Sequence, residues 1–147
     1  MLPTQPPIVD VIFNRTYGSR RDVIEAIGDV MLASAAITPP YVDGMLRKEE
    51  EGCTIVTTEV ALPHGTHDVK HAVLRNAVVV VPIPDGIEWA AGRRVRLAIG
   101  FAGASDQAHL RLMGAVARVL SDEQMVTRLM SATRPQEIAD VLEELER

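Results

Sequence analysis

The chain has 147 residues, of which 47% are apolar, 24% charged and only 3% aromatic. These values are typical of one globular domain with an aliphatic core, and they exclude a disordered chain. The formal net charge is −5. An acidic chain offers no electrostatic basis for binding the phosphate backbone, so we expect no nucleic-acid partner.

Three features bear on where the protein works. The longest apolar run, residues 77–83, is too short to span a bilayer, and the opening residues lack the pattern of a secretory signal. Cys53 is the single cysteine and cannot form an internal disulfide. We therefore expect a cytoplasmic protein that is not embedded in a membrane.

The N-terminal half alternates between strand and helix patterns. Residues 8–14, "IVDVIFN", predict a first strand. Ser19 and Asp22 form a capping box at the start of a helix with a single apolar face. "ITPPY" ends that helix and begins another, with Pro40 in its first turn. A strand or loop follows over residues 54–62.

The C-terminal half begins with two very apolar segments. Residues 76–84, "NAVVVVPIP", and residues 94–102, "RVRLAIGFA", predict strands buried on both faces. Between them, "PDGIEW" (84–89) is typical of a turn. Three helices are predicted after these strands, with N-caps at Ser105, at Ser121 with Gln124, and at Thr133 with Gln136.

Strands separated by helices predict a single α/β domain over residues 1–147, with a mixed, mostly parallel sheet flanked by helices. This arrangement bears on two histidines. His64 follows a strand directly, and His109 lies in the first turn of a helix that follows another strand. Ligands of open α/β sheets bind at the edge where strands end, so both rings are candidates for a site there.

Metal binding is one chemistry that the histidines could perform. His64, His67 and His71 have an i, i+3, i+7 spacing, and zinc accepts three imidazoles. However, Pro63 and Gly65 flank the first of them, which is unlike a helix interior, and no H-E-x-x-H motif occurs. A metal-binding module therefore stays an alternative, and a short surface turn explains His67 and His71 better.

Nucleophilic transfer through an imidazole ring is the other chemistry. A neutral ring nitrogen can attack phosphorus when a hydrogen bond to the second nitrogen fixes the tautomer. Pro63 stiffens the approach to His64, and Gly65 lets a phosphate or a partner's backbone come close. The phosphoryl group in transfer needs cations or N–H groups around it. His109, at a helix N-terminus, is expected to be neutral and able to donate one N–H.

Five stretches of the sequence resemble the IIA domain of the bacterial sugar phosphotransferase system, of the mannitol–fructose type. They are "YVDGMLRKEE" (41–50), "VALPHGTHDVK" (60–70), "VVVVPIPDGIEW" (78–89), "RLAIGFAG" (96–103) and "AHLRLMGAVARVLSDE" (108–123). "A-L-P-H-G-T" is the most specific piece, and its "G-T" is most similar to mannitol-type members. In order and spacing the resemblance covers nearly the whole chain.

The resemblance implies a phosphocarrier with no cofactor. Its phosphoryl donor would be phospho-HPr, itself charged from phosphoenolpyruvate by Enzyme I, and its acceptor a IIB domain that works with a membrane IIC domain in sugar or sugar-alcohol uptake. His64 matches the phosphorylated histidine, which uses Nε2, and His109 matches the second histidine, which supports the phosphoryl group. Leu62, Gly103 and Ala104 are candidates for an apolar rim that a partner contacts, and Gly65 for close approach.

The chain departs from the family pattern at two places. The arginine expected after "M-L-x" is replaced by Lys48, with Arg47 one position earlier. Lysine keeps the charge without the two-pronged grip of a guanidinium, and Arg47 would point about 100° away around a regular helix. In the turn before His64 the chain has Thr57-Thr58-Glu59 where relatives carry Gly-Glu-Ser or Gly-Asn-Gly types, and Thr58 could offer a hydroxyl. A regulatory IIA-like protein, phosphorylated without serving sugar transport, is the second alternative.

Overall fold

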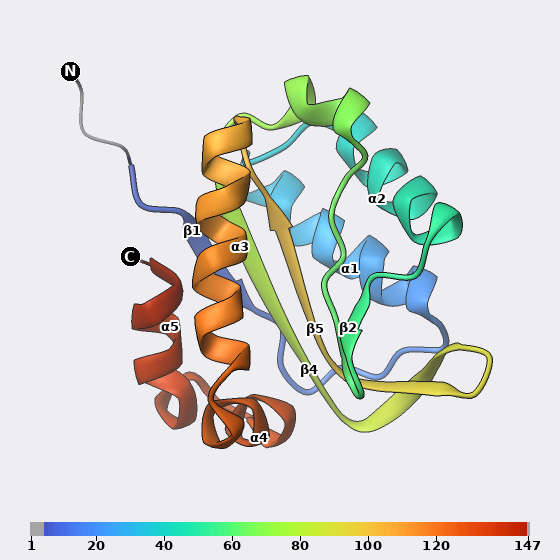
Figure 1. Ribbon diagram of the computed structural model, residues 1–147, viewed down its shortest axis with the longest axis vertical. Coiled ribbons are helices and arrows are strands. Elements are labelled where there is room, and N and C mark those ends of the chain that lie inside the picture. Colours follow the sequence, from blue (N-terminus) through green and yellow to red (C-terminus); the bar gives the residue numbers. More distant parts are fainter. Residues whose placement is uncertain (1–4, 147) are drawn as a thin grey trace.

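The computed structural model describes residues 5–146 as a three-layer arrangement of helices, sheet and helices (Figure 1). The strands are β1 (Ile8–Val11), β2 (Ile55–Thr57), β3 (Val60–Ala61), β4 (Ala77–Ala90) and β5 (Arg93–Ala102). The helices are α1 (Arg20–Ala33), α2 (Pro40–Glu51), α3 (Asp106–Leu120), α4 (Glu123–Ser131) and α5 (Ala139–Glu146), with 3₁₀ helices η1 (His67–Ala72) and η2 (Pro135–Ile138). Within the described residues, no helix has the length and apolarity that crossing a membrane requires.

The five strands form one sheet in the order β1-β4-β5-β3-β2. β1 pairs with β4 and β3 with β5 in parallel, whereas β4 pairs with β5 and β2 with β3 antiparallel. The predicted mixed sheet flanked by helices is therefore confirmed. Because β3 and β5 are parallel, the segments that leave their carboxyl ends emerge at the same edge of the sheet.

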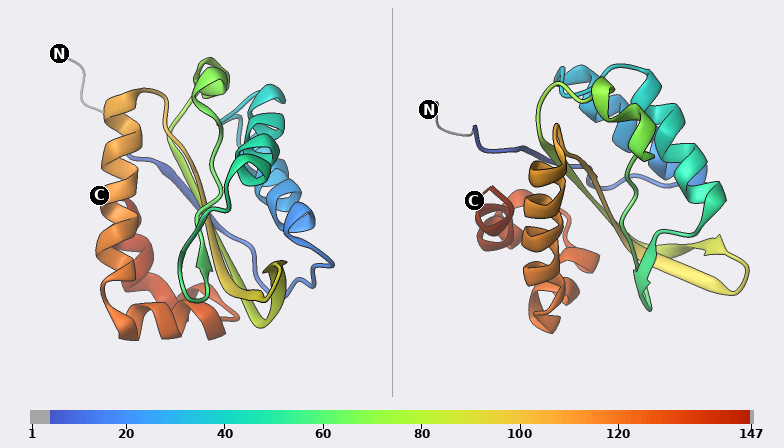
Figure 2. Two further views of the ribbon diagram at one scale, coloured as in Figure 1. Left: turned by 45° about the vertical axis from the view of Figure 1, so that its right-hand side comes forward. Right: turned by 45° about the horizontal axis from the view of Figure 1, so that its top comes forward.

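Consecutive residues of a strand point to opposite faces of the sheet. Because consecutive residues in the central parts of β4 and β5 are apolar, both faces of the sheet are apolar. Val79 and Val81 pack on one face against α1 and α2, and Val78 and Val80 pack on the other against α3, α4 and α5. Figure 2 shows the two groups of helices on opposite sides of the strands. This two-sided burial is the reason that residues 76–84 lack an alternation of apolar and polar side chains.

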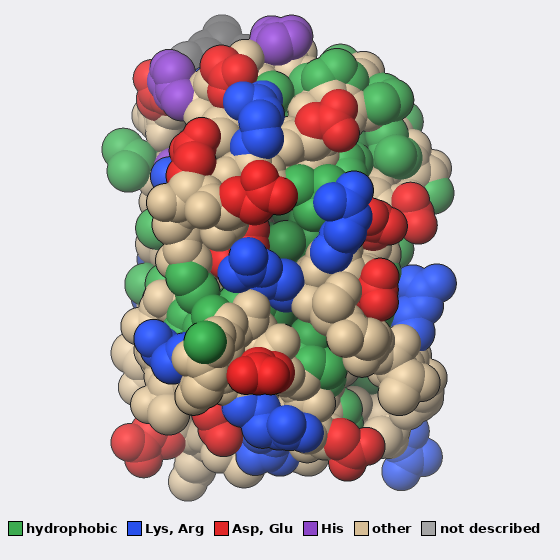
Figure 3. Space-filling model, turned by 90° about the vertical axis from the view of Figure 1, so that its right-hand side faces the viewer, with side chains coloured by type: hydrophobic (Ala, Val, Ile, Leu, Met, Phe, Trp, Pro, Cys, Tyr) green, Lys and Arg blue, Asp and Glu red, His purple; other side chains and the backbone are tan. Residues whose placement is uncertain are grey.

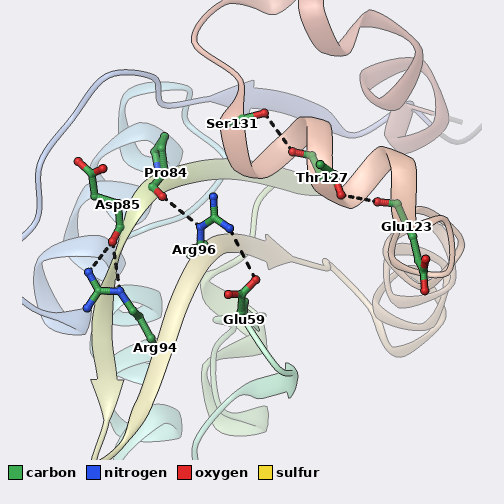
Figure 4. Close-up of polar contacts among 8 residues, drawn as sticks. All are labelled: Glu59, Pro84, Asp85, Arg94, Arg96, Glu123, Thr127 and Ser131. Carbon is green, nitrogen blue, oxygen red and sulfur yellow. Dashed lines mark hydrogen bonds and ion pairs between the residues drawn. The ribbon is translucent and has the colours of Figure 1, made fainter.

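The turn predicted at "PDGIEW" (84–89) is wrong, because these residues continue β4 and the hairpin turns at residues 91–92. Gly86 and Gly92 both have φ of +71°, which glycine adopts without strain. The first lies at an irregularity in the β4–β5 pairing, a bulge stabilised by arginine side chains (Figure 4). Arg94 donates to the carbonyls of Asp85 and Gly86. The turn chemistry of the sequence therefore marks a bulge here.

Arg96 makes further polar contacts at the same end of the β4–β5 hairpin. It donates through Nε to the Pro84 carbonyl at 3.1 Å and forms a 3.9 Å ion pair with Glu59. Thr58 and Glu59 form the turn between β2 and β3. The β2–β3 turn, which departs from the family pattern, is therefore linked to the β4–β5 hairpin through Glu59 and Arg96, as Figure 4 shows.

The helix caps were predicted with mixed success. Ser19 and Ser105 cap α1 and α3 as expected, each accepting a backbone N–H three residues on. The predicted box partner of Ser19, Asp22, accepts from the N–H of Gly18 instead of that of Ser19. The cap of α4 is Asp122 rather than Ser121, because its carboxylate accepts two N–H groups at 3.0 and 3.2 Å. Thr133 likewise pairs with Glu137 and not with Gln136, and a 3₁₀ turn precedes α5.

Candidate functional site

A pocket of about 180 Å³ opens at the carboxyl edge of β3 and β5. It is lined by Tyr41, Lys48, His64, Gly65, Thr66, His67, Lys70, Gly103, Asp106 and His109. These residues come from α2, from the segment after β3, from η1, from the loop after β5 and from the start of α3. The predicted meeting of His64 and His109 at this edge is confirmed, with ring centroids 5.6 Å apart.

The backbone fixes the orientation and tautomer of His64. Its Nδ1 lies 2.8 Å from the carbonyl oxygen of Leu62, two residues earlier. A carbonyl only accepts, so Nδ1 carries the proton and Nε2 carries the lone pair. The Pro63 carbonyl accepts from the Phe101 N–H at 3.1 Å, which ties the same segment to β5. This tautomer leaves on Nε2 the free lone pair that a nucleophilic imidazole needs.

The ring of Phe101 contacts both histidine rings. Its ring is stacked on His64, with centroids 4.9 Å apart and planes 23° apart, and lies 5.2 Å from His109. Phe101 is fully buried. Gly103 allows the backbone of α3 to come close, because a Cβ at this position would lie 2.7 Å from the backbone nitrogen of His109. One aromatic side chain and one close backbone approach therefore set the spacing of the two rings.

Tyr41 is the link between α2 and the nucleophile segment. Its hydroxyl donates to the Phe101 carbonyl at 2.9 Å and accepts from the Gly65 N–H at 3.0 Å. Burial raises the pKa of Tyr41 to about 12, so it stays a neutral donor. The contact with Gly65 leaves no room for a side chain, because a Cβ would lie 2.5 Å from Cε1 of Tyr41. Gly65 thus has a packing role beside the expected one.

Lys48 and Arg47 lie in different places, as the helical geometry predicted. Lys48 lines the pocket, whereas Arg47 donates both terminal nitrogens to Asp68 on η1 at 3.3 Å. The carboxylate of Glu49 is buried and accepts from the N–H and the hydroxyl of Thr54, at 2.8 and 2.6 Å. This bond anchors the end of α2 from which Lys48 reaches the site.

Two further predicted residues are placed away from the pocket lining. Thr58 is exposed in the β2–β3 turn, at the far end of the short strand that leads to His64. The Leu62 side chain is buried in the core beneath α3, so it offers no rim to a partner, and its carbonyl provides the bond to His64. Tyr41, Phe101 and Lys70 were missed, because no local motif marks a residue that contacts the site only through the fold.

The metal alternative is not supported by the described part of the chain. Residues 5–146 contain no group of three or more His, Cys, Asp or Glu side chains placed to hold an ion. His67 and His71 are exposed on η1, the short surface turn that was predicted for them. Figure 3 shows histidine side chains at the upper end of the molecule, above a surface on which acidic and basic groups alternate.

Burial keeps both site histidines neutral. The pKa of His64 is lowered mainly by desolvation, and the nearby charge of Lys48 adds to this effect, while the Leu62 bond opposes it. The pKa of His109 is also lowered, first by burial and then by His64, Lys70 and Lys48. A lowered pKa leaves the imidazole unprotonated at neutral pH, as attack on phosphorus requires.

We expect an NMR titration to give pKa values for His64 and His109 below the roughly 6.5 of an unperturbed histidine. Ring ¹⁵N shifts of His64 should identify the tautomer with the proton on Nδ1, because only that form donates to Leu62. A short histidine peptide in the same buffer serves as the control. A pKa above that of the peptide, or a proton on Nε2 at neutral pH, would contradict this description.

Residues 8–145 match the protein family described as "Phosphoenolpyruvate-dependent sugar phosphotransferase system, EIIA 2". The chain belongs to this family. It is a IIA component of the mannitol type, since its relatives include the mannitol-specific IIA component of Staphylococcus aureus. That protein is 32% identical over 135 residues, which cover 92% of each chain.

Two other relatives show how the family is built. The mannitol-specific IIA component of Bacillus subtilis is 27% identical and covers 92% of this chain and 94% of its own. The multiphosphoryl transfer protein of Salmonella typhi is 33% identical over 138 residues, which are 94% of this chain but 36% of that protein. The IIA unit therefore occurs both alone and within a longer chain, and the present chain spans about a third of the latter.

Solved structures agree with the fold. The crystal structure of Escherichia coli IIA mannitol superimposes with a TM-score of 0.81 at 27% identity, covering 90% of this chain and 94% of that one. The complex of Escherichia coli IIA and phosphorylated IIB mannitol enzymes gives 0.82 at 27% identity, covering 90% and 93%. These matches cover nine-tenths of the chain and establish the single α/β architecture for this IIA component.

Proposed function

We propose that this IIA component is a phosphocarrier that accepts a phosphoryl group from phospho-HPr on Nε2 of His64 and passes it to a IIB domain. The observation that supports this most directly is the 2.8 Å bond from Nδ1 of His64 to the Leu62 carbonyl, inside a pocket lined by cations. The Escherichia coli relative is found in complex with phosphorylated IIB. We propose the same partner for this chain.

In the proposed transfer, the lone pair of Nε2 forms the new P–N bond as the P–N bond to the donor nitrogen breaks. The electron pair of the broken bond returns to the donor, and the proton on Nδ1 of His64 stays in place. His109 is expected to donate one N–H to a phosphoryl oxygen, and Lys48 to balance the negative charge. Lys48 thus performs at least the charge role of the arginine it replaces.

Leu110 and Met113 offer a docking surface for the two partners. Leu110 follows His109 directly on α3 and Met113 lies four residues beyond it, and the two residues are 71% and 37% exposed. Large apolar side chains exposed next to a functional pocket are typical of a transient protein interface. We propose this surface in place of the rim that the sequence placed at Leu62.

The direct test is intact mass after incubation with phosphoenolpyruvate, Enzyme I and HPr. Wild-type protein is expected to gain one phosphoryl group, lose it in acid and retain it in base, as a phosphohistidine does. Addition of a mannitol-type IIB domain should then move the group onto IIB. Omission of HPr is the control, because phosphoenolpyruvate alone is not the proposed donor. No gain in mass would refute the carrier function.

The same experiment separates the regulatory alternative. A regulatory IIA-like protein would be phosphorylated but would not transfer the group to IIB. Transfer onward would support a role in sugar or sugar-alcohol uptake, together with a membrane IIC domain and from the cytoplasmic side. The relatives named mannitol-specific make mannitol the first sugar alcohol to test.

A further inference from the structure

A second lysine, on η1, lines the pocket together with Lys48 of α2. Lys70 lies on η1, and its side chain is only 26% exposed. Its ammonium forms an ion pair with Asp106, the first residue of α3, and lies 3.4 Å from Nδ1 of His67. The sequence analysis gave this lysine no role.

The charge of Lys70 acts on His109, one of the two site histidines. It is among the groups that lower the pKa of His109, after burial and His64 and ahead of Lys48. The two lysines therefore act on the same ring from different elements. Among the residues that line the pocket, Lys48 and Lys70 are the two lysines, and no arginine of the kind expected of the family is present.

The ion pair between Lys70 and Asp106 is weak enough for a phosphoryl group to replace the Asp106 carboxylate. The side chain of Asp106 is 79% exposed, and ion pairs with an exposed partner contribute little to stability. A phosphoryl group carries nearly two negative charges and three acceptor oxygens, against one charge for a carboxylate. Lysine has a flexible stem and rotatable donors, so its ammonium can turn from one anion to the other without rearrangement of η1.

We infer that Lys70 is a second cation of the phosphoryl site and that Asp106 is its counter-ion in the unphosphorylated protein. When His64 is phosphorylated, the ammonium leaves Asp106 and binds the phosphoryl oxygens. No covalent bond beyond the P–N bond of the transfer changes, and no proton moves. This inference rests on the proposed function, because it requires a phosphoryl group on His64.

The exchange predicts opposite effects from the two partners of one ion pair. Lys70→Met should shift the equilibrium of phosphoryl transfer about tenfold toward phospho-HPr, because a charge-assisted bond is lost and Asp106 is left to repel the group. Asp106→Asn should shift it about threefold the other way, because the ammonium is released. The ³¹P titration of the phosphorylated protein should move in parallel, with a higher phosphoryl pKa in Lys70→Met and a lower one in Asp106→Asn.

Arg47→Met is the matched control, since Arg47 forms a comparable ion pair with Asp68 but does not line the pocket. It should leave the equilibrium and the ³¹P titration unchanged, and Lys70→Arg should retain wild-type values within about twofold. Equal losses from Lys70→Met and Asp106→Asn would mean a merely structural ion pair and overturn the inference, as would an unchanged Lys70→Met. A wild-type protein that takes up no phosphoryl group would refute the proposed function itself, and the inference with it.

Discussion

His64→Gln is expected to take up no phosphoryl group from phospho-HPr, a loss of at least about 10⁴-fold in rate. Glutamine keeps a polar side chain of similar length, so the fold and the surface for HPr should persist. Its amide nitrogen has no free lone pair, however, and cannot form the P–N bond that Nε2 of His64 forms. Intact mass and a radiolabelled transfer assay would measure the loss.

His71→Gln is the matched control, because His71 is exposed on η1 and does not line the pocket. It should be phosphorylated at the wild-type rate. His109→Gln should fall between the two, since this ring supports the group without bonding to it. A phosphorylated His64→Gln would place the acceptor elsewhere, and His109 would then be the next candidate.

The placement of the two histidines was predictable from the sequence because it depends on topology. A residue just after a strand and a residue in the first turn of the next helix reach the same edge whenever the strands are parallel, as β3 and β5 are. The helix of residues 40–51 likewise predicted the separation of Lys48 from Arg47, because consecutive residues of a regular helix point about 100° apart.

The remaining geometry depends on contacts between residues far apart in sequence. Tyr41 joins Gly65 to Phe101 through one hydroxyl, and nothing in the local sequence of α2 indicates this bond. Lys70 meets Asp106 only after η1 and α3 have been placed at the same edge. The bulge in β4 was mistaken for a turn for a related reason, since the arginine that stabilises it, Arg94, lies on the following strand.

Phe101→Ala is expected to lower the free energy of unfolding by about 3–5 kcal/mol, among the largest effects of a single substitution in a core. The ring is fully buried and packs between the sheet and α3, where its removal leaves a cavity beneath both histidines. Chemical denaturation followed by circular dichroism would measure the change. Met113→Ala, a partly exposed residue of α3, is the matched truncation and should lose less than about 1 kcal/mol.

The pH dependence of the Phe101→Ala effect reports on the site itself. Histidines with a lowered pKa bind fewer protons in the folded than in the unfolded protein, so wild-type stability falls as the pH drops below about 6.5 toward the folded values. Loss of the ring exposes His64 and His109 to water and should return both pKa values toward 6.5. The variant is then expected to lose less stability than wild type over that window, and its deficit is largest at neutral pH. An equal deficit at every pH would mean that Phe101 packs beneath the histidines without controlling their protonation.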